Sequence, residues 1–140
     1  MTSDRIKELM RRFYDELVNQ GKLDLIDELL SENFVEHEEF PGISQDREGV
    51  KQFFAMLRAA FPDVTMTPEH IVVEDDIAVG NVKVRGTHQG EFMGIPASGR
   101  SIDVREVDVV RFEGDVAVEH WGAFDAIHLL EQLGASPEAS

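Results

Sequence analysis

The chain has 140 residues, of which 28 are acidic and 13 are basic, so its formal net charge at pH 7 is -15. This length suits one domain, and 42% hydrophobic residues with 29% charged residues are typical of a globular protein. Phosphate backbones and anionic membranes attract basic surfaces, so the charge argues against nucleic-acid and membrane partners. Because there is no cysteine, disulfides, thiolate catalysis and cysteine-ligated metal sites are excluded.

The first part of the chain has the periodicity of helices. In the first predicted helix, apolar residues recur every three or four positions. Ser3 is its expected N-cap and Gly21 is its expected stop. A shorter helix and an extended segment at residues 34–37 are expected next. The apolar residues are Ile6, Leu9, Met10, Phe13, Tyr14 and Leu17 in the first helix and Leu23, Ile26, Leu29 and Leu30 in the second.

A third helix and then a series of strands are predicted in the rest of the chain. Asp46 is the expected N-cap of this helix and Pro62 ends it, with an apolar face of Val50, Phe53, Phe54, Leu57 and Phe61. Strands are predicted at 64–74, 77–88, 100–113 and 116–121, and a last helix at 125–133. Helices followed by hairpins predict an α+β domain with its helices on one face of a sheet. We expect one domain over residues 1–134 and a flexible tail over 135–140.

The strand at 100–113 carries two acidic residues where apolar ones are expected. Because strand residues alternate between two faces, one face holds Ile102, Val104, Glu106, Asp108, Val110 and Phe112. If this face meets the helices, Glu106 and Asp108 lie in an apolar interior. An unpaired buried carboxylate is costly, so each should be paired or protonated. A ligand pocket explains them best, and a buried structural pair is the alternative.

Further polar residues can approach this acid pair. His120 shares a strand face with Val116 and Val118, and the hairpin places that strand beside the acid pair. Tyr14 lies on a buried helix face, where its hydroxyl needs a hydrogen-bond partner. His37 follows an apolar strand start and could act as a general base near neutral pH. Each residue also has a purely structural interpretation: a core tyrosine, a structural histidine, or a solvated acidic run of Glu36, Glu38 and Glu39 around His37.

The sequence predicts neither a metal nor a cofactor. A divalent ion between Glu36, His37, Glu106 and Asp108 is conceivable, but the five histidines lack metal-ligand spacing. There is no Gly-x-Gly-x-x-Gly or phosphate-loop pattern. No apolar run approaches the roughly 20 residues of a membrane helix, and the start has no signal-peptide core. We therefore expect a cytoplasmic protein whose partner is a small hydrophobic molecule.

Four segments together resemble the SnoaL-like polyketide cyclases, often called ester cyclases. They are residues 86–99, Asp-Val-Val-Arg-Phe at 108–112, Glu-His-Trp at 119–121 and Gln-Leu-Gly at 132–134, and the resemblance spans nearly the whole chain. It implies a nuclear-transport-factor-2-like cone, in which a curved antiparallel sheet wraps around the N-terminal helices and forms an apolar pocket. It also implies a homodimer paired through the sheet, for which the face of Arg105, Val107, Val109 and Arg111 could supply the contact.

The sequence departs from the cyclases at one important position. These enzymes use an acid/base aspartate directly after the Glu-His-Trp-like segment, where this chain has Gly122. The nearest following carboxylate, Asp125, is expected to cap the last helix. A more distant similarity, to ketosteroid isomerase, implies hydrogen-bond donors at Tyr14 and at a protonated Asp108, with His37 at the position of the base.

These observations predict acid/base chemistry of the lyase or isomerase kind, without a cofactor. His37, or else Glu36, would remove a proton beside a carbonyl group, and Tyr14 and neutral Asp108 would stabilise the enolate. Cyclisation, isomerisation and elimination share this intermediate. The alternatives are a non-catalytic binder of an apolar ligand, and epoxide hydrolysis or oxygenation on the same fold. The predicted substrate-binding residues are Glu36, Phe54, Glu106, His120 and Trp121.

Overall fold

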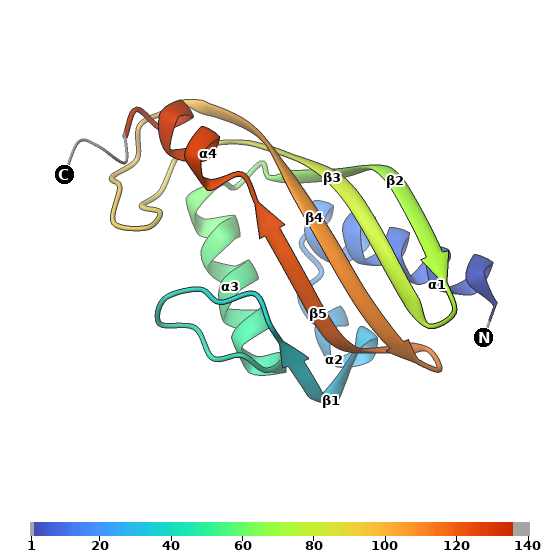
Figure 1. Cartoon of the computed structure of the whole chain (residues 1–140). Helices are drawn as coiled ribbons and strands as arrows, with labels where there is room; N and C mark the ends of the chain where they lie inside the picture. The colour runs from blue at the N-terminus through green and yellow to red at the C-terminus, as the bar shows by residue number, and fades with distance from the viewer. Residues whose placement is uncertain (1, 136–140) are drawn as a thin grey trace.

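The computed structural model describes residues 2–135 and shows a five-stranded sheet that curves around helices from the first half of the chain (Figure 1). The strand order in the sheet is β1-β5-β4-β3-β2, with β1 parallel to β5 and every other neighbour antiparallel. The predicted α+β class is therefore confirmed. The strands are β1 (Leu30–Glu36), β2 (Thr65–Glu74), β3 (Ile77–Thr87), β4 (Ser101–Glu113) and β5 (Val116–Phe124).

The N-terminal helix changes type along its length. It begins as α1 (Ser3–Arg12) and continues as the π-helix η1 (Phe13–Asn19), which pack against β2 and β3. The N-cap is Thr2, whose hydroxyl oxygen accepts from the Arg5 N–H at 3.2 Å, and not Ser3 as predicted. Gly21 has φ +73° and ends the helical segment as expected, because a left-handed residue cannot continue it.

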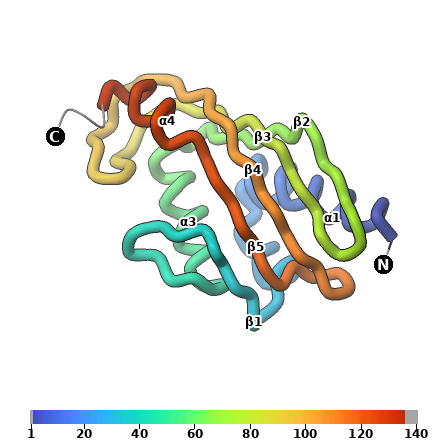
Figure 2. Tube along the Cα trace, viewed as in Figure 1, coloured from blue at the N-terminus to red at the C-terminus, as the bar shows by residue number. Residues whose placement is uncertain are grey.

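Two further helices complete the layer that covers one face of the sheet. The short α2 (Leu25–Leu29) leads directly into β1, and α3 (Arg47–Ala60) packs against β1 (Figure 2). Asp46 caps α3 as predicted, since its carboxylate accepts from the Gly49 N–H at 2.9 Å. The helices thus lie along the same sheet face as the mixed apolar and acidic stripe of β4.

The hairpin of β4 and β5 contains an irregularity that the alternation rule missed. Arg111 pairs with Glu119 but the next residue, Phe112, pairs with Ala117, so β5 has one extra residue there. Ala117 is consequently buried on the inner face, where Val116 and Val118 were expected. Beyond this bulge, His120 returns to the inner face as predicted.

The chain ends its described part with α4 (Ala126–Gln132), which packs on β4. Asp125 caps this helix, as expected, because its carboxylate accepts from the His128 N–H at 3.2 Å. Most of the predicted tail, residues 136–140, lies outside the described residues. Within residues 2–135, no helix is both long enough and apolar enough to cross a membrane.

Two isoleucines test where the stability of this fold resides. Ile6 on α1 is completely buried, whereas Ile127 on α4 is 62% exposed. Ile6→Ala is expected to lower the free energy of unfolding by about 2–5 kcal/mol, because it removes buried methyl groups and leaves a cavity. Ile127→Ala is expected to change it by less than about 0.5 kcal/mol. Urea unfolding of both variants measures the difference, and equal effects would contradict the described packing.

Candidate active site

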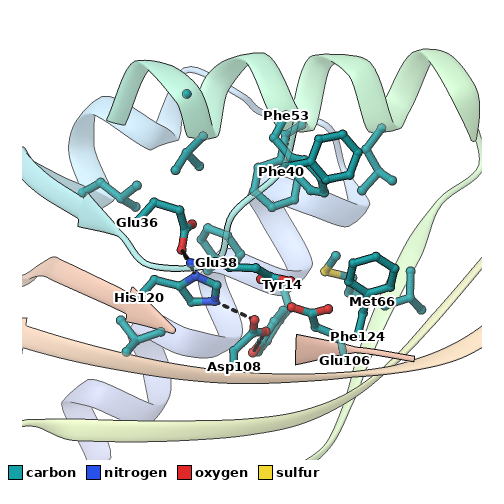
Figure 3. A pocket seen from close by; sticks show the side chains of 18 of the residues that line it. Tyr14, Glu36, Glu38, Phe40, Phe53, Met66, Glu106, Asp108, His120 and Phe124 are labelled. Atoms are coloured by element: carbon teal, nitrogen blue, oxygen red, sulfur yellow. Dashed lines mark hydrogen bonds and ion pairs between the residues drawn. The ribbon is translucent and has the colours of Figure 1, made fainter. Parts of the chain in front are cut away.

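A cavity with mostly apolar walls lies between the helices and the inner face of the sheet (Figure 3). All six residues of the predicted β4 stripe line it, from Ile102 to Phe112, so the predicted pocket is present. Its walls also include Phe54, which was predicted to bind substrate. All nine phenylalanines of the chain line this cavity: Phe13, Phe34, Phe40, Phe53, Phe54, Phe61, Phe92, Phe112 and Phe124.

The segment that begins in β1 alternates between the cavity and the outside over seven residues. The inward members line the cavity; they are Phe34, Glu36, Glu38 and Phe40. The outward members are exposed; they are Val35, His37 and Glu39. The acidic run is therefore only partly solvated. Glu38 was not predicted as a site residue, although a period of two counted onward from Phe34 would have found it.

His37 and Trp121 do not lie in the cavity, contrary to the predicted roles. The His37 Nε2 atom is 2.8 Å from Glu119 Oε2, and the imidazole ring stacks on Trp121 with 4.8 Å between centroids. Neither residue lines the cavity. His37 directly follows an inward residue of an extended segment, so its side chain must point outward, where Glu119 and Trp121 hold it. His37 therefore does not lie where a base that acts in the cavity would have to lie.

Four polar side chains from four different elements form one hydrogen-bonded series, here called the buried polar chain. The Tyr14 hydroxyl donates to Asp108 Oδ2 at 2.8 Å, and Asp108 Oδ1 lies 2.8 Å from His120 Nε2. His120 Nδ1 bonds in turn to Glu36 Oε2 (Figure 3). The members come from η1, β4, β5 and β1, so Tyr14 and Asp108 meet as expected and His120 approaches the acid pair, whereas His37, the third residue expected there, does not take part.

Protonation in the buried polar chain follows from these contacts. Burial alone would lower the pKa of His120, but its bonds to Asp108 and Glu36 outweigh burial and raise that pKa to about 10. His120 is therefore an imidazolium near neutral pH and donates through both nitrogens. Burial and the neighbouring Asp108 raise the pKa of Tyr14, so its hydroxyl stays a donor.

This arrangement corrects the predicted role of Asp108. Tyr14 and a neutral Asp108 were expected to donate side by side to one substrate oxygen. Instead Tyr14 and His120 both donate to Asp108, which serves as the acceptor at the centre of the buried polar chain. The carboxyl group held neutral is Glu106, because burial first, and then the nearby Asp108 and Glu38, raise its pKa to about 12.

Glycine makes room for Tyr14 on the neighbouring strand. Gly80 in β3 pairs with Asp108 in β4, and a Cβ atom at Gly80 would clash with the Tyr14 hydroxyl oxygen. That hydroxyl can reach Asp108 only because no side chain stands at position 80. Tyr14 belongs to the π-helix η1 and lies against Gly80, and only 1% of Tyr14 is exposed to solvent.

Three carboxyl groups and one imidazole of the cavity wall are close enough together to be compared with a cation site. One ligand atom from each of Glu38, Glu106, Asp108 and His120 lies within 4.8 Å of the others. Ligation by His120 requires a neutral imidazole, so the residue would have to lose the proton that it shares with its carboxylate neighbours. The hydrogen bonding therefore suits a proton-transfer site better than a metal centre.

Glu106 gives stability a characteristic dependence on pH. Its pKa rises from 4.5 in the unfolded chain to about 12 in the fold, so unfolding releases a proton between these values. The stabilising effect of this proton is complete below pH 4.5 and is lost as the pH rises towards the folded pKa. In Glu106→Gln, the decline of unfolding free energy between about pH 6 and about pH 9 is expected to be shallower, by up to about 1.4 kcal/mol per pH unit. Urea unfolding at several pH values measures the slopes, and equal slopes would contradict a protonated Glu106.

Comparison with known proteins identifies the family. The model of the SnoaL-like polyketide cyclase family matches residues 8–133. No curated protein matches the chain. Among solved structures, TsrD from Streptomyces laurentii has a TM-score of 0.88 and 28% identity, covering 96% of this chain and 98% of TsrD. IdmH from Streptomyces antibioticus, provisionally described as a polyketide cyclase, has a TM-score of 0.80 and 33% identity, covering 92% and 98%.

A third structure has a different provisional description. AclR from Streptomyces galilaeus, provisionally described as a hydroxylase, has a TM-score of 0.85 and 28% identity, covering 98% of this chain and 85% of AclR. These matches confirm the predicted nuclear-transport-factor-2-like fold, with its sheet curved around the N-terminal helices. The chain belongs to the SnoaL-like polyketide cyclase family.

Proposed function

We propose that this protein is an enzyme that moves protons on a small hydrophobic carbonyl compound by acid/base chemistry. The observation that carries the proposal is the grouping of ionisable side chains on the wall of an otherwise apolar cavity. Buried charges are costly, so a cluster of this kind is typical of a catalytic site. The provisional description of IdmH as a polyketide cyclase supports cyclisation as the outcome.

The cavity can supply each requirement of enolate chemistry. Its phenylalanine walls favour a flat, hydrophobic compound and exclude water. A carboxylate of the wall removes a proton from the carbon next to the carbonyl group. The negative charge that develops on the oxygen is stabilised by a donor such as the neutral Glu106, in a medium where such bonds are strong. The enolate then closes a ring, shifts a double bond or expels a leaving group.

A second candidate is hydroxylation, which the similarity to AclR favours. It would consume dioxygen, whereas enolate chemistry would not. Oxygen uptake in the presence of an accepted compound therefore distinguishes the two. Binding without turnover is a further alternative, and it would show neither oxygen uptake nor exchange of hydrogen in the bound compound.

Asp108→Asn tests the proposed chemistry. The enzyme is expected to accelerate deuterium exchange next to the carbonyl group of a flat ketone such as β-tetralone, followed by proton NMR in D2O. An amide at position 108 keeps the size of the side chain but removes the charge that Tyr14 and His120 hold, so we expect a loss of about 10²–10⁴-fold.

Asp103→Asn is the matched control, because Asp103 lies on the same strand but is exposed and pairs with Lys83 at 3.0 Å. It should leave the exchange rate unchanged. If the unchanged protein accelerates no exchange while a bound ketone is detected, the protein is a binder and not an enzyme of this kind.

We also propose that two copies pair through the outer face of the sheet. The residues at one register level there form an apolar row, namely Val72, Val79, Val109 and Trp121. Val72 is 58% exposed and Trp121 is 37% exposed, although both are large and apolar.

Val109→Glu places a charge at the centre of this row, so it is expected to shift the protein from dimer to monomer in sedimentation equilibrium. A monomeric unchanged protein at all concentrations would contradict the pairing.

A further inference from the structure

The inner face of β5 leaves a space at Gly122 that carboxyl groups fill. Gly122 pairs with Asp108, and a Cβ atom at position 122 would clash with Glu38 Oε1, lie 2.8 Å from the His120 Cε1 atom and lie 3.0 Å from Glu106 Oε1. Gly122 does not have a positive φ, so its backbone does not require glycine. A side chain at this position and the carboxyl group of Glu38 therefore exclude one another.

Glu38 and Glu106 reach this space from opposite walls of the cavity. Glu38 follows β1, and Glu106 lies on β4, two residues before Asp108 (Figure 3). Both side chains line the cavity, and a carboxyl oxygen of Glu38 lies within 4.8 Å of a carboxyl oxygen of Glu106. Two carboxyl groups this close together in an apolar cavity disfavour each other's ionised form, so we expect them to hold one proton between them at neutral pH.

The charges around the two groups decide which of them keeps that proton. Burial is the main reason that the pKa of Glu106 rises to about 12, and the neighbouring Asp108 and Glu38 raise it further because they disfavour the ionised form. Burial also raises the pKa of Glu38, but the hydrogen bond from Glu106 and the positive charge of His120 lower it. Asp108 and Glu36 act on Glu38 in the opposite direction. The balance leaves Glu106 protonated as the donor and Glu38 as the acceptor.

Neither of these glutamates is neutralised by a fixed cation. Within the described residues, Glu36 and Asp108 share the imidazolium of His120, whereas neither Glu38 nor Glu106 forms an ion pair. A carboxylate that is ion-paired and hydrogen-bonded is a weaker base than one that is not. The carboxyl group free to accept a proton from a bound compound is therefore that of Glu38.

We propose that Glu38 is the general base of this site and Glu106 its acid partner, in the space that Gly122 leaves open. This inference rests on the proposed function. Glu38 takes a proton from the carbon next to the carbonyl group, and the electron pair of that C–H bond forms the enolate. The O–H of Glu106 turns from Glu38 to the enolate oxygen. In a ring closure, the enolate carbon bonds to a second carbonyl carbon of the same compound, whose oxygen receives the proton from Glu38.

Glu38→Gln tests the base directly. It is expected to lower the rate of deuterium exchange in β-tetralone by about 10²–10⁴-fold, because an amide cannot accept the proton. Glu39→Gln is the matched control, since Glu39 is the next residue in the chain but is exposed and does not line the cavity. Exchange retained in Glu38→Gln would overturn the role of Glu38 and leave the proposed function intact. No exchange by the unchanged protein while the ketone is bound would overturn both.

A second pair of variants tests whether the location of the carboxyl group matters and not the residue that carries it. Glu38→Ala removes the group and should lose exchange, whereas Glu38→Ala combined with Gly122→Asp returns a carboxyl group to the same space from β5. The double variant is expected to recover exchange by at least about tenfold over Glu38→Ala. No recovery in a double variant whose His120 ring keeps its wild-type NMR signals would contradict the proposed location of the base, because this control shows that the residue at position 122 has not displaced the imidazole.

The shared proton has a signature that needs no substrate. The infrared band of a protonated carboxyl group should be present at neutral pH, disappear in Glu106→Gln and persist in Glu39→Gln. If Glu106→Gln leaves the band unchanged, Glu106 is not the acid partner and the proposed pair is wrong. This readout is independent of catalysis, so it distinguishes failure of the pair from failure of the proposed function.

Discussion

One buried positive charge makes the polar interior of this protein possible. The imidazolium of His120 bonds to Asp108 and to Glu36, both of which face an apolar cavity. Transferring an ion from water into a protein interior costs several kcal/mol, and only good pairing offsets this cost. Without His120, two carboxylates from β4 and β1 would face each other unpaired. The approach of β1 to β5, where Glu36 pairs with His120, therefore depends on electrostatics as well as on backbone hydrogen bonds.

Space is the second requirement, and two glycines on neighbouring strands provide it. Gly80, Asp108 and Gly122 lie at one register level across β3, β4 and β5. One glycine admits the hydroxyl group of Tyr14 and the other admits the carboxyl group of Glu38. The resemblance to polyketide cyclases suggested that glycine at position 122 removes an acid/base group. The structure shows that a carboxyl group from the opposite wall fills that space.

Prediction from the sequence succeeded where a pattern was long and unbroken. The β4 stripe alternates over its whole length, so the burial of Glu106 and Asp108 could be read directly. Prediction failed where one extra residue reverses the face of the sheet on which the following side chains lie. The bulge at Val118 has no sequence signal in a single chain, and it brings Ala117 inward. The sequence predicts His37, or else Glu36, as the base from residue type, whereas the alternation of the extended segment turns His37 outward and Glu38 inward. Tyr14 donates to Asp108 and not to a substrate oxygen because the two side chains lie close together in the fold, and no local sequence pattern contains that distance.

The two acidic clusters of the cavity differ in how freely they can change their charge. Asp108 and Glu36 both bond to a histidine whose pKa is raised to about 10, so an imidazolium lies between them across the neutral range. Glu38 and Glu106 have no such cation bonded to them among the described residues, and both have raised pKa values. A site that must accept and return a proton needs carboxyl groups that are not ion-paired, such as Glu38 and Glu106, and ion-paired groups such as Asp108 and Glu36 can hold the site in place. The buried polar chain is thus best understood as the fixed electrostatic support, and the pair at Gly122 as the part that reacts.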